Sequence, residues 1–144
     1  MLLLALSADP RATVVALAER LDMARNTVQA RLARLDRAGA FLAYERSVNP
    51  VPLGYPLQAF IEVDVEQKRL AAVVEQLERI PEIIQAHGLS GPIDLLLRVL
   101  CRSAEDLFRI NGLVLAVDGV QRTETALAME ELIPYRITPL LKRE

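Results

Sequence analysis

The sequence predicts an α+β chain with two parts, the first mainly helical and the second a four-stranded sheet with two helices. Three observations lead to this prediction. Apolar residues in the first forty positions recur with helical spacing. Three prolines and one glycine then gather between residues 50 and 56, a density that interrupts helices and central strands. Beyond them, strand and helix patterns alternate in the order βαββαβ, the ferredoxin-like split.

The first part is read as two helices placed between a short apolar segment and a short strand. The apolar segment is expected over residues 1–8, the helices over 14–21 and 24–35, and the strand over 41–46. Thr13 has the side chain of a helix N-cap, and Gly39 follows the second helix as a stop signal. The break between the two helices makes a helix-turn-helix, and the strand adds a wing.

The second part follows the proline cluster. Strands are expected over 57–65, 83–89, 94–101 and 121–129, and helices over 69–80 and 103–115. A tail over 130–144 contains Pro134 and Pro139 and is expected to pack on this domain or on a partner chain. The predicted domains are therefore residues 1–50, a linker over 51–56, and residues 57–144 with the tail included.

Composition and charge limit the class of protein. With 52% hydrophobic and 25% charged residues, the 144-residue chain is globular in composition. No apolar run approaches the roughly 18 residues of a membrane span, and the single cysteine, Cys101, cannot form an internal disulfide. We therefore expect a cytoplasmic protein without membrane contact. Residues 1–50 sum to 7 − 5 = +2 and residues 51–144 to 10 − 14 = −4, which predicts different partners for the two parts.

The second predicted helix is basic on its outer side. Val28, Leu32 and Leu35 cluster within about 60° and form the buried seam. The opposite side carries arginines and amides separated by alanines, a slim surface that suits the DNA major groove. A solvated helix face is the alternative, because arginine-rich helices are common, but the preceding helix and tight break favour DNA binding.

The positions along this helix predict different contacts with DNA. Residues of the first turns are expected at base edges, later arginines at phosphates, and Arg31, close to the seam, as a brace of the fold or an edge contact. Arg46 in the wing is expected to reach a flanking phosphate. The predicted DNA-binding residues are Arg11, Arg25, Asn26, Thr27, Gln29, Arg31, Arg34, Arg37 and Arg46.

Catalysis is not expected. The sequence shows no nucleophile–base pair, no glycine loop that would cradle a phosphate, and no set of metal ligands, since His87 is the only histidine. The chain is therefore predicted to be neither an enzyme nor a metal protein, and to need no cofactor. Two binding functions stay open: a DNA-binding regulator, or a sensing and assembly module whose DNA-binding half is vestigial.

Several motifs together resemble one family of regulators. They are Asp9-Pro10-Arg11-Ala12-Thr13, Met23 to Leu32, Val48-Asn49-Pro50, Leu53-Gly54, Gly91 with Asp94, and Gly119-Val120 followed by Thr123 and Thr125. With them the chain resembles the Lrp/AsnC ("feast/famine") family of transcription regulators over nearly its whole length. The resemblance implies a winged helix-turn-helix joined to a βαββαβ regulatory domain. It also implies promoter DNA and a small amino-acid effector as partners, and homodimers that assemble into tetramers or octamers.

The resemblance also directs attention to the loop over residues 90–94. Gly91 permits a backbone bend, Asp94 could accept hydrogen bonds from an α-ammonium group, and nearby hydroxyls could bind a carboxylate. The alternative is that Gly91 only makes a turn and that Asp94 satisfies turn amides. The candidate effector-binding residues are Ser90, Gly91, Asp94, Thr123 and Thr125.

Overall fold

The computed structural model of the chain describes residues 1–42 and 48–142, so most of the predicted strand over 41–46, including Arg46, lies outside the described residues. Two compact units are present, Met1–Val48 with Leu132–Glu144 and Asn49–Glu131. The predicted linker over 51–56 lies close to this boundary. The predicted second domain included the whole tail over 130–144, whereas Leu132–Glu144 is grouped with the first unit.

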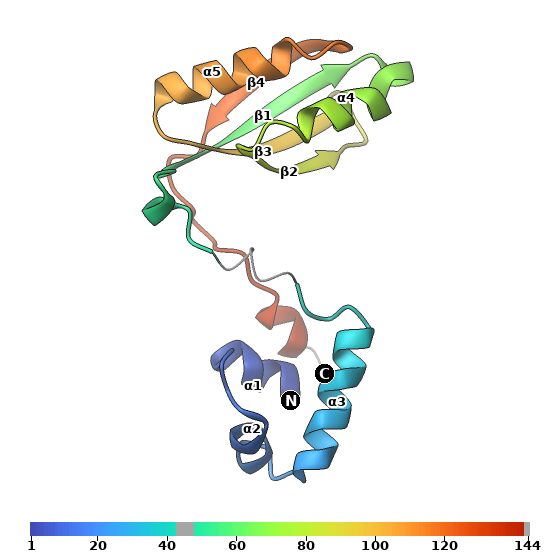
Figure 1. The fold of residues 1–144 in the computed structure, drawn as a ribbon, viewed down its shortest axis with the longest axis vertical. Helices are drawn as coiled ribbons and strands as arrows, with labels where there is room; N and C mark the ends of the chain where they lie inside the picture. Colours follow the sequence, from blue (N-terminus) through green and yellow to red (C-terminus); the bar gives the residue numbers. More distant parts are fainter. Residues whose placement is uncertain (43–47, 143–144) are drawn as a thin grey trace. The chain divides into compact units, whose positions relative to one another are not determined.

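Three helices build the first unit: α1 (Leu2–Ala8), α2 (Val14–Arg20) and α3 (Arg25–Arg37) (Figure 1). Leu2, Ala5, Leu17, Ala18 and Val28 form its buried core. The predicted cap of α2 is confirmed, since Thr13 Oγ1 accepts a hydrogen bond from the Ala16 amide at 3.2 Å. The C-terminal 3₁₀ turn (Thr138–Lys142) contacts α1, which explains why the tail belongs to this unit.

The turn between α2 and α3 is closed by backbone hydrogen bonds. The Met23 amide donates to the Ala18 carbonyl at 2.9 Å, and the Asp22 amide donates to the Glu19 carbonyl at 3.3 Å, which is the Schellman pattern. Asp22 stands at the left-handed position, with φ +49°, where glycine is the usual residue. This turn sets the direction in which α3 leaves α2.

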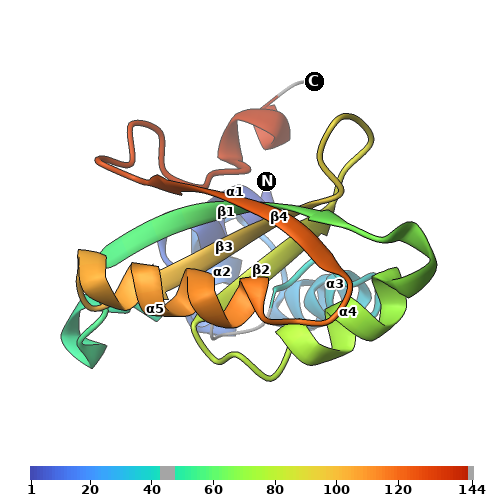
Figure 2. The same cartoon turned by 90° about the horizontal axis from the view of Figure 1, so that it is seen from above.

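The second unit is a four-stranded antiparallel sheet with two helices on one face (Figures 1 and 2). Its elements are β1 (Leu57–Val65), α4 (Leu70–Leu77), β2 (Ile83–Gly88), β3 (Leu95–Cys101), α5 (Ala104–Leu115) and β4 (Val120–Leu127). The strand order is β2-β3-β1-β4, so the predicted βαββαβ split is confirmed and β2 and β4 are the edges.

Alternation along β1 and β3 gives the sheet two different faces. Ile61 and Val63 on β1 and Leu97 and Val99 on β3 are fully buried against α4 and α5. The residues between them point to the opposite face, here called the open face, which no helix of the described second unit covers. The periodicity of two that predicted β1, and that β3 shares in the structure, therefore also separates core from open face. The predicted helix over 69–80 is shorter than expected, because residues 67–69 form a 3₁₀ turn and α4 ends at Leu77.

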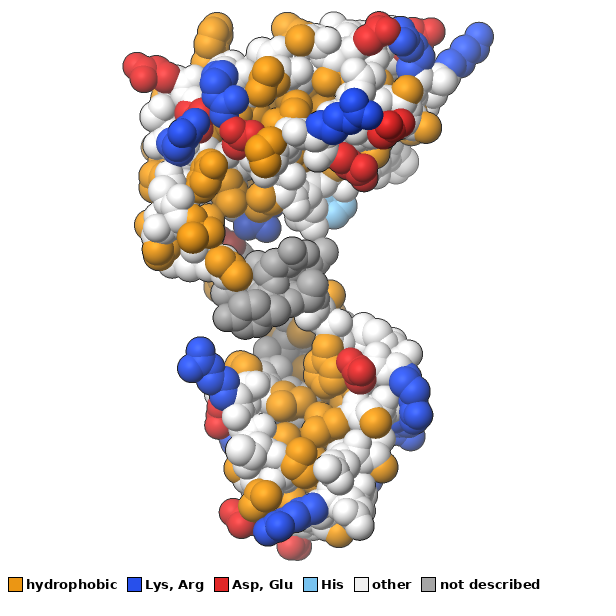
Figure 3. Space-filling model, in the orientation of Figure 1, with side chains coloured by type: hydrophobic (Ala, Val, Ile, Leu, Met, Phe, Trp, Pro, Cys, Tyr) orange, Lys and Arg blue, Asp and Glu red, His pale blue; other side chains and the backbone are white. Residues whose placement is uncertain are grey.

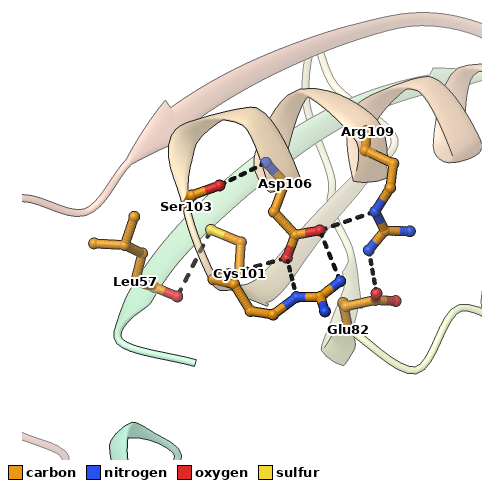
Figure 4. A network of polar contacts seen from close by, with 7 residues as sticks. Leu57, Glu82, Cys101, Ser103, Asp106 and Arg109 are labelled. Atoms are coloured by element: carbon orange, nitrogen blue, oxygen red, sulfur yellow. Dashed lines mark hydrogen bonds and ion pairs between the residues drawn. The ribbon is translucent and has the colours of Figure 1, made fainter. Parts of the chain in front are cut away.

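A buried carboxylate ties α5 to the sheet (Figure 4). The Asp106 carboxylate accepts hydrogen bonds from the Arg102 amide at 3.0 Å and from the guanidinium groups of Arg102 and Arg109. Arg109 also pairs with the buried Glu82. These hydrogen bonds, mainly those from Arg102, hold the pKa of Asp106 well below its usual range.

Candidate DNA interface and effector site

Helix α3 presents the two faces that its sequence predicts. Val28 is fully buried, and Leu32 and Leu35 are partly buried against the core of the first unit. The predicted contact residues of α3 are all exposed, namely Arg25, Asn26, Thr27, Gln29, Arg31, Arg34 and Arg37. From Arg25 to Arg37 they extend over about 18 Å of helix. The exposed side is therefore long enough to follow a groove of DNA.

The arginines of α3 differ from those of the second unit in their partners. Among the described residues, none of the four arginines of α3 forms an ion pair with a carboxylate. In the second unit, five arginines each form such a pair: Arg69, Arg79, Arg102, Arg109 and Arg122. Figure 3 shows basic side chains that project from the edge of the first unit where α3 runs. The charge of α3 is thus available to an external anion.

Three further observations describe the basic surface of the first unit. Arg31 turns back toward the helix-turn-helix turn, where its Nη1 lies 3.7 Å from the Met23 sulfur, which fits the bracing role expected for it. Arg20, in the last turn of α2, is exposed and was not predicted from the sequence, because contacts were expected mainly on the second helix. Arg11 is exposed at the start of the α2 segment, as a phosphate contact requires.

The start of α3 lacks a side-chain cap. Ala24 occupies the N-cap position with extended backbone and can offer no oxygen to the first-turn amides. By contrast, Thr13 and Ser103 cap α2 and α5 through their hydroxyls. The first turn of α3, which carries Arg25, Asn26 and Thr27, is therefore held less firmly than the corresponding turns of α2 and α5.

In the second unit, Asp94 is engaged by its own chain. Its Oδ2 accepts a hydrogen bond from the Val65 amide at 2.8 Å, and its Oδ1 accepts one from the Gln67 side chain. The Asp94 amide donates to the Val63 carbonyl at 3.2 Å. These contacts favour the alternative in which Asp94 satisfies local amides and anchors the loop to the end of β1.

The other predicted effector residues lie around this anchor without converging. Ser90 and Gly91 are exposed in the loop, and Gly91 makes the expected bend with φ +144°. Thr123 and Thr125 pair with Val63 and Ile61, so they share the helix-covered face of the sheet. Thr123 is partly buried and Thr125 is exposed.

A hollow of about 330 Å³ lies close to this loop. Its lining residues are Glu62, Asp64, Pro92, Ile93, Arg122 and Glu124. Glu62 pairs with Glu124 and Asp64 with Arg122 across the β1–β4 ladder, so these four side chains share the open face. None of these residues was predicted as a site residue. The predicted residues Asp94, Thr123 and Thr125 are each one position away from a lining residue. Because neighbouring residues of a strand point to opposite faces, Thr123 and Thr125 lie on the other face of the sheet.

The charged groups of the hollow are only partly compensated. Arg122 forms an ion pair with Glu124, and this hydrogen bond, with Asp64 and Glu62 adding to it, raises the pKa of the Arg122 guanidinium. Asp64 Oδ1 is buried and has no hydrogen-bond partner among the described residues. Within the same described part of the chain, no three His, Cys, Asp or Glu side chains are grouped to hold a metal ion, and no helix is long and apolar enough to cross a bilayer.

Comparison with known proteins adds the family to this geometry. The sequence pattern of a winged helix-turn-helix DNA-binding domain matches residues 1–40, which include α1 to α3. The pattern of the Lrp/AsnC ligand binding domain matches residues 58–138, more than half of the chain and nearly the whole sheet. The chain belongs to the Lrp/AsnC family of transcription regulators. As a member of this Lrp/AsnC family, it is a DNA-binding regulator of transcription, and the family resemblance seen in the sequence is confirmed.

Relatives and solved structures agree with this assignment. An uncharacterised helix-turn-helix transcriptional regulator of Pyrococcus abyssi is 32% identical over 85% of this chain and 78% of its own length. The regulator AldR of Mycobacterium tuberculosis is 31% identical over 88% of this chain and 73% of its own. The structure of Escherichia coli AsnC superposes with a TM-score of 0.86 at 26% identity and covers 96% of this chain and 94% of that chain.

Solved structures with this fold include complexes with an amino acid. The feast or famine regulatory protein from M. tuberculosis, complexed with L-methionine, has a TM-score of 0.83 and 27% identity to this Lrp/AsnC chain, and the alignment covers 94% of this chain and 92% of that one. That protein therefore binds an amino acid on the same fold.

Proposed function

We propose that α3 is the recognition helix of this regulator and that it binds promoter DNA. Arg25, Asn26, Thr27 and Gln29 in its first turns read base edges, and Arg34 and Arg37 contact phosphates. Arg11 adds a phosphate contact, and Arg46, outside the described residues, is assigned the flanking contact of the wing. The single observation that supports this most is that the arginines of α3 are exposed and form no ion pair among the described residues, while five arginines of the second unit are paired with carboxylates.

The proposed mechanism is binding rather than catalysis. Each arginine that reaches a phosphate releases condensed counterions, so affinity depends steeply on salt. With its target on promoter DNA, the protein acts in the cytoplasm. One chain carries few such contacts, and an assembly that presents several recognition helices gains avidity.

We propose a homodimer formed through the open face of the sheet, with tetramers or octamers built from it. The open face carries Phe60 on β1 and Leu96 and Leu100 on β3, which are only partly buried in the single chain. Arg98 lies among them and donates two hydrogen bonds to Gln58 Oε1, at 2.8 and 2.6 Å. This apolar patch of the open face, in which Arg98 is hydrogen-bonded within the chain, is suited to pack on a second copy.

We propose further that an amino acid binds the second unit and changes DNA affinity or assembly. Support comes from the match to the ligand binding domain and from the methionine complex of the M. tuberculosis relative. The loop with Ser90 and Gly91 is the proposed entrance, and Asp94 positions that loop. Thr123 and Thr125 share the helix-covered face of the sheet and are not assigned to this entrance. An effector must bind one state better than another, since equal affinity would change nothing.

The test is DNA binding by the full chain. A labelled fragment from upstream of the protein's own gene should bind at low salt and lose affinity as salt rises. Addition of the twenty amino acids, one at a time, should reveal one that shifts the midpoint of the DNA-binding curve. Absence of binding at low salt would reject the DNA-binding proposal. DNA binding that no amino acid alters would reject the effector proposal but would not affect the proposal that α3 is the recognition helix.

A further inference from the structure

The hollow beside the 90–94 loop has a charge that selects among possible ligands. Three carboxylates, those of Glu62, Asp64 and Glu124, face one guanidinium, that of Arg122, so the lining sums to 1 − 3 = −2. The direct cross-strand pairing of Glu62 with Glu124 places like charges opposite each other, which destabilises a sheet. A chain that only had to fold would be more stable with an opposite charge in this pair.

The single arginine does not neutralise the group. Arg122 is paired with Glu124, and among the described residues no other Lys, Arg or His forms an ion pair with Glu62 or Asp64. Asp64 Oδ1, moreover, is buried without any hydrogen bond in the described structure. A buried carboxylate oxygen with no donor is unfavourable, so a ligand that brings N–H donors and positive charge would relieve it.

The shape of the hollow favours an organic cation over a metal ion. The described carboxylates do not converge in a set that could hold a metal. The space, about 330 Å³, is far larger than one ion needs, and Pro92 and Ile93 supply an apolar wall for methylene groups. Arg122 has five N–H donors in all, so some stay available for a carboxylate after its pairing with Glu124.

We propose that this hollow binds an amino acid with a cationic side chain, of the lysine and arginine class. The two positive groups of the ligand face Glu62 and Asp64, its carboxylate faces Arg122, and its methylenes lie on Pro92 and Ile93. A neutral amino acid would leave the net charge of −2 unchanged, whereas a basic one reduces it. This inference rests on the proposed effector function and specifies its ligand class.

The position of the hollow links this ligand to assembly. Its four charged residues are on the open face, the same face that is proposed to meet a second copy. Two copies that pack there bring two acidic hollows toward one interface, and their repulsion opposes association. A basic amino acid lowers that repulsion, so it should bind the associated state more tightly and promote it, as linkage requires.

The experiment is isothermal titration calorimetry of the full chain with L-lysine, L-leucine and L-glutamate, followed by light scattering. L-lysine should bind with the lowest Kd of the three and increase the associated fraction. Asp64→Asn should raise the Kd for L-lysine at least about tenfold, the scale of one lost charged hydrogen bond. Glu62→Gln should raise the Kd to a similar extent in a chain that keeps the Asp64 carboxylate. Glu78→Gln, an exposed carboxylate at the end of α4, is the matched control and should leave the Kd unchanged.

Different results reject different claims. If L-leucine binds as tightly as L-lysine, or if both hollow variants keep the parent Kd, the charge-based assignment is wrong. If another amino acid nevertheless shifts the DNA affinity in that case, the proposed effector-regulated function is still supported. If L-lysine binds as predicted but changes neither DNA affinity nor association, the hollow is a lysine site and the effector proposal fails.

Discussion

Replacement of Arg37 by alanine is expected to reduce the salt dependence of DNA binding and to leave the fold intact. Arg37 is in the last turn of α3, exposed and without an ion pair among the described residues. Alanine is a slightly better helix former than arginine, while the loss of a cation near the helix C-terminus is unfavourable. These two effects oppose each other and should change stability by less than about 1 kcal/mol.

The magnitude follows from the number of phosphates that the variant no longer neutralises. Each arginine–phosphate pair adds about 0.9 to the slope of log K against log salt. Between 50 and 200 mM salt, a fourfold change, one such pair therefore accounts for an affinity loss of about 3.5-fold. In a dimer with two α3 helices the substitution removes two such pairs. The factor by which rising salt weakens DNA binding should therefore be about twelve times smaller for the variant than for the parent over this range.

Fluorescence anisotropy with labelled promoter DNA at five or six salt concentrations measures both slopes. Arg79→Ala is the matched control, because it removes one arginine from the second unit, where Arg79 pairs with Glu75 on α4. The control should keep the parent slope. If Arg37→Ala also keeps that slope, or if both variants lower it equally, the assignment of Arg37 to a phosphate contact is refuted.

Three further predictions concern α3 and the second unit. Gln29→Ala should weaken binding to the cognate site by about 1–3 kcal/mol more than binding to random DNA; equal losses in competition assays would make Gln29 a positioning residue. Ala24→Ser should supply the missing cap of α3 and stabilise the first unit by about 1 kcal/mol. Calorimetry should show a higher unfolding temperature for this variant, and a lower one for Thr13→Ala, which removes the cap of α2. Asp106 has a lowered pKa, so its stabilising effect is present above the unfolded pKa of about 4 and is lost as pH falls below it. Asp106→Asn should therefore be less stable than the parent in urea unfolding at pH 7, and the difference should shrink below pH 4; a constant difference would contradict the assignment.

Local patterns were sufficient for most of the fold. The seam of Val28, Leu32 and Leu35 predicted which side of α3 is buried, because helical periodicity is a property of the chain itself. The hydroxyl of Thr13 and its place before an apolar run predicted the start of α2. Alternation over residues 57–65 predicted the strand β1, and the order of elements predicted the split topology.

Details that depend on distant partners needed the structure. The tail was expected on the second domain or on a partner chain, yet its last turn contacts α1, since 3₁₀ and coil segments carry no periodicity that reveals their partner. The carboxylate of Asp94 could serve a ligand or the chain. The hydrogen bonds that Asp94 accepts from the Val65 amide and the Gln67 side chain, nearly thirty residues away in sequence, favour the second alternative, and no local pattern could predict them.

The sequence by itself determined the class of the protein: a helix-turn-helix with a basic outer side, followed by a βαββαβ unit, in the Lrp/AsnC pattern. The tertiary structure decided which residues of that second unit share a surface. A shift of one residue along β4 exchanges Thr123 for Arg122 or Glu124 and moves the site to the other face of the sheet. Register and the pairing of side chains across strands arise from contacts between distant segments, and those contacts form only when the chain is folded.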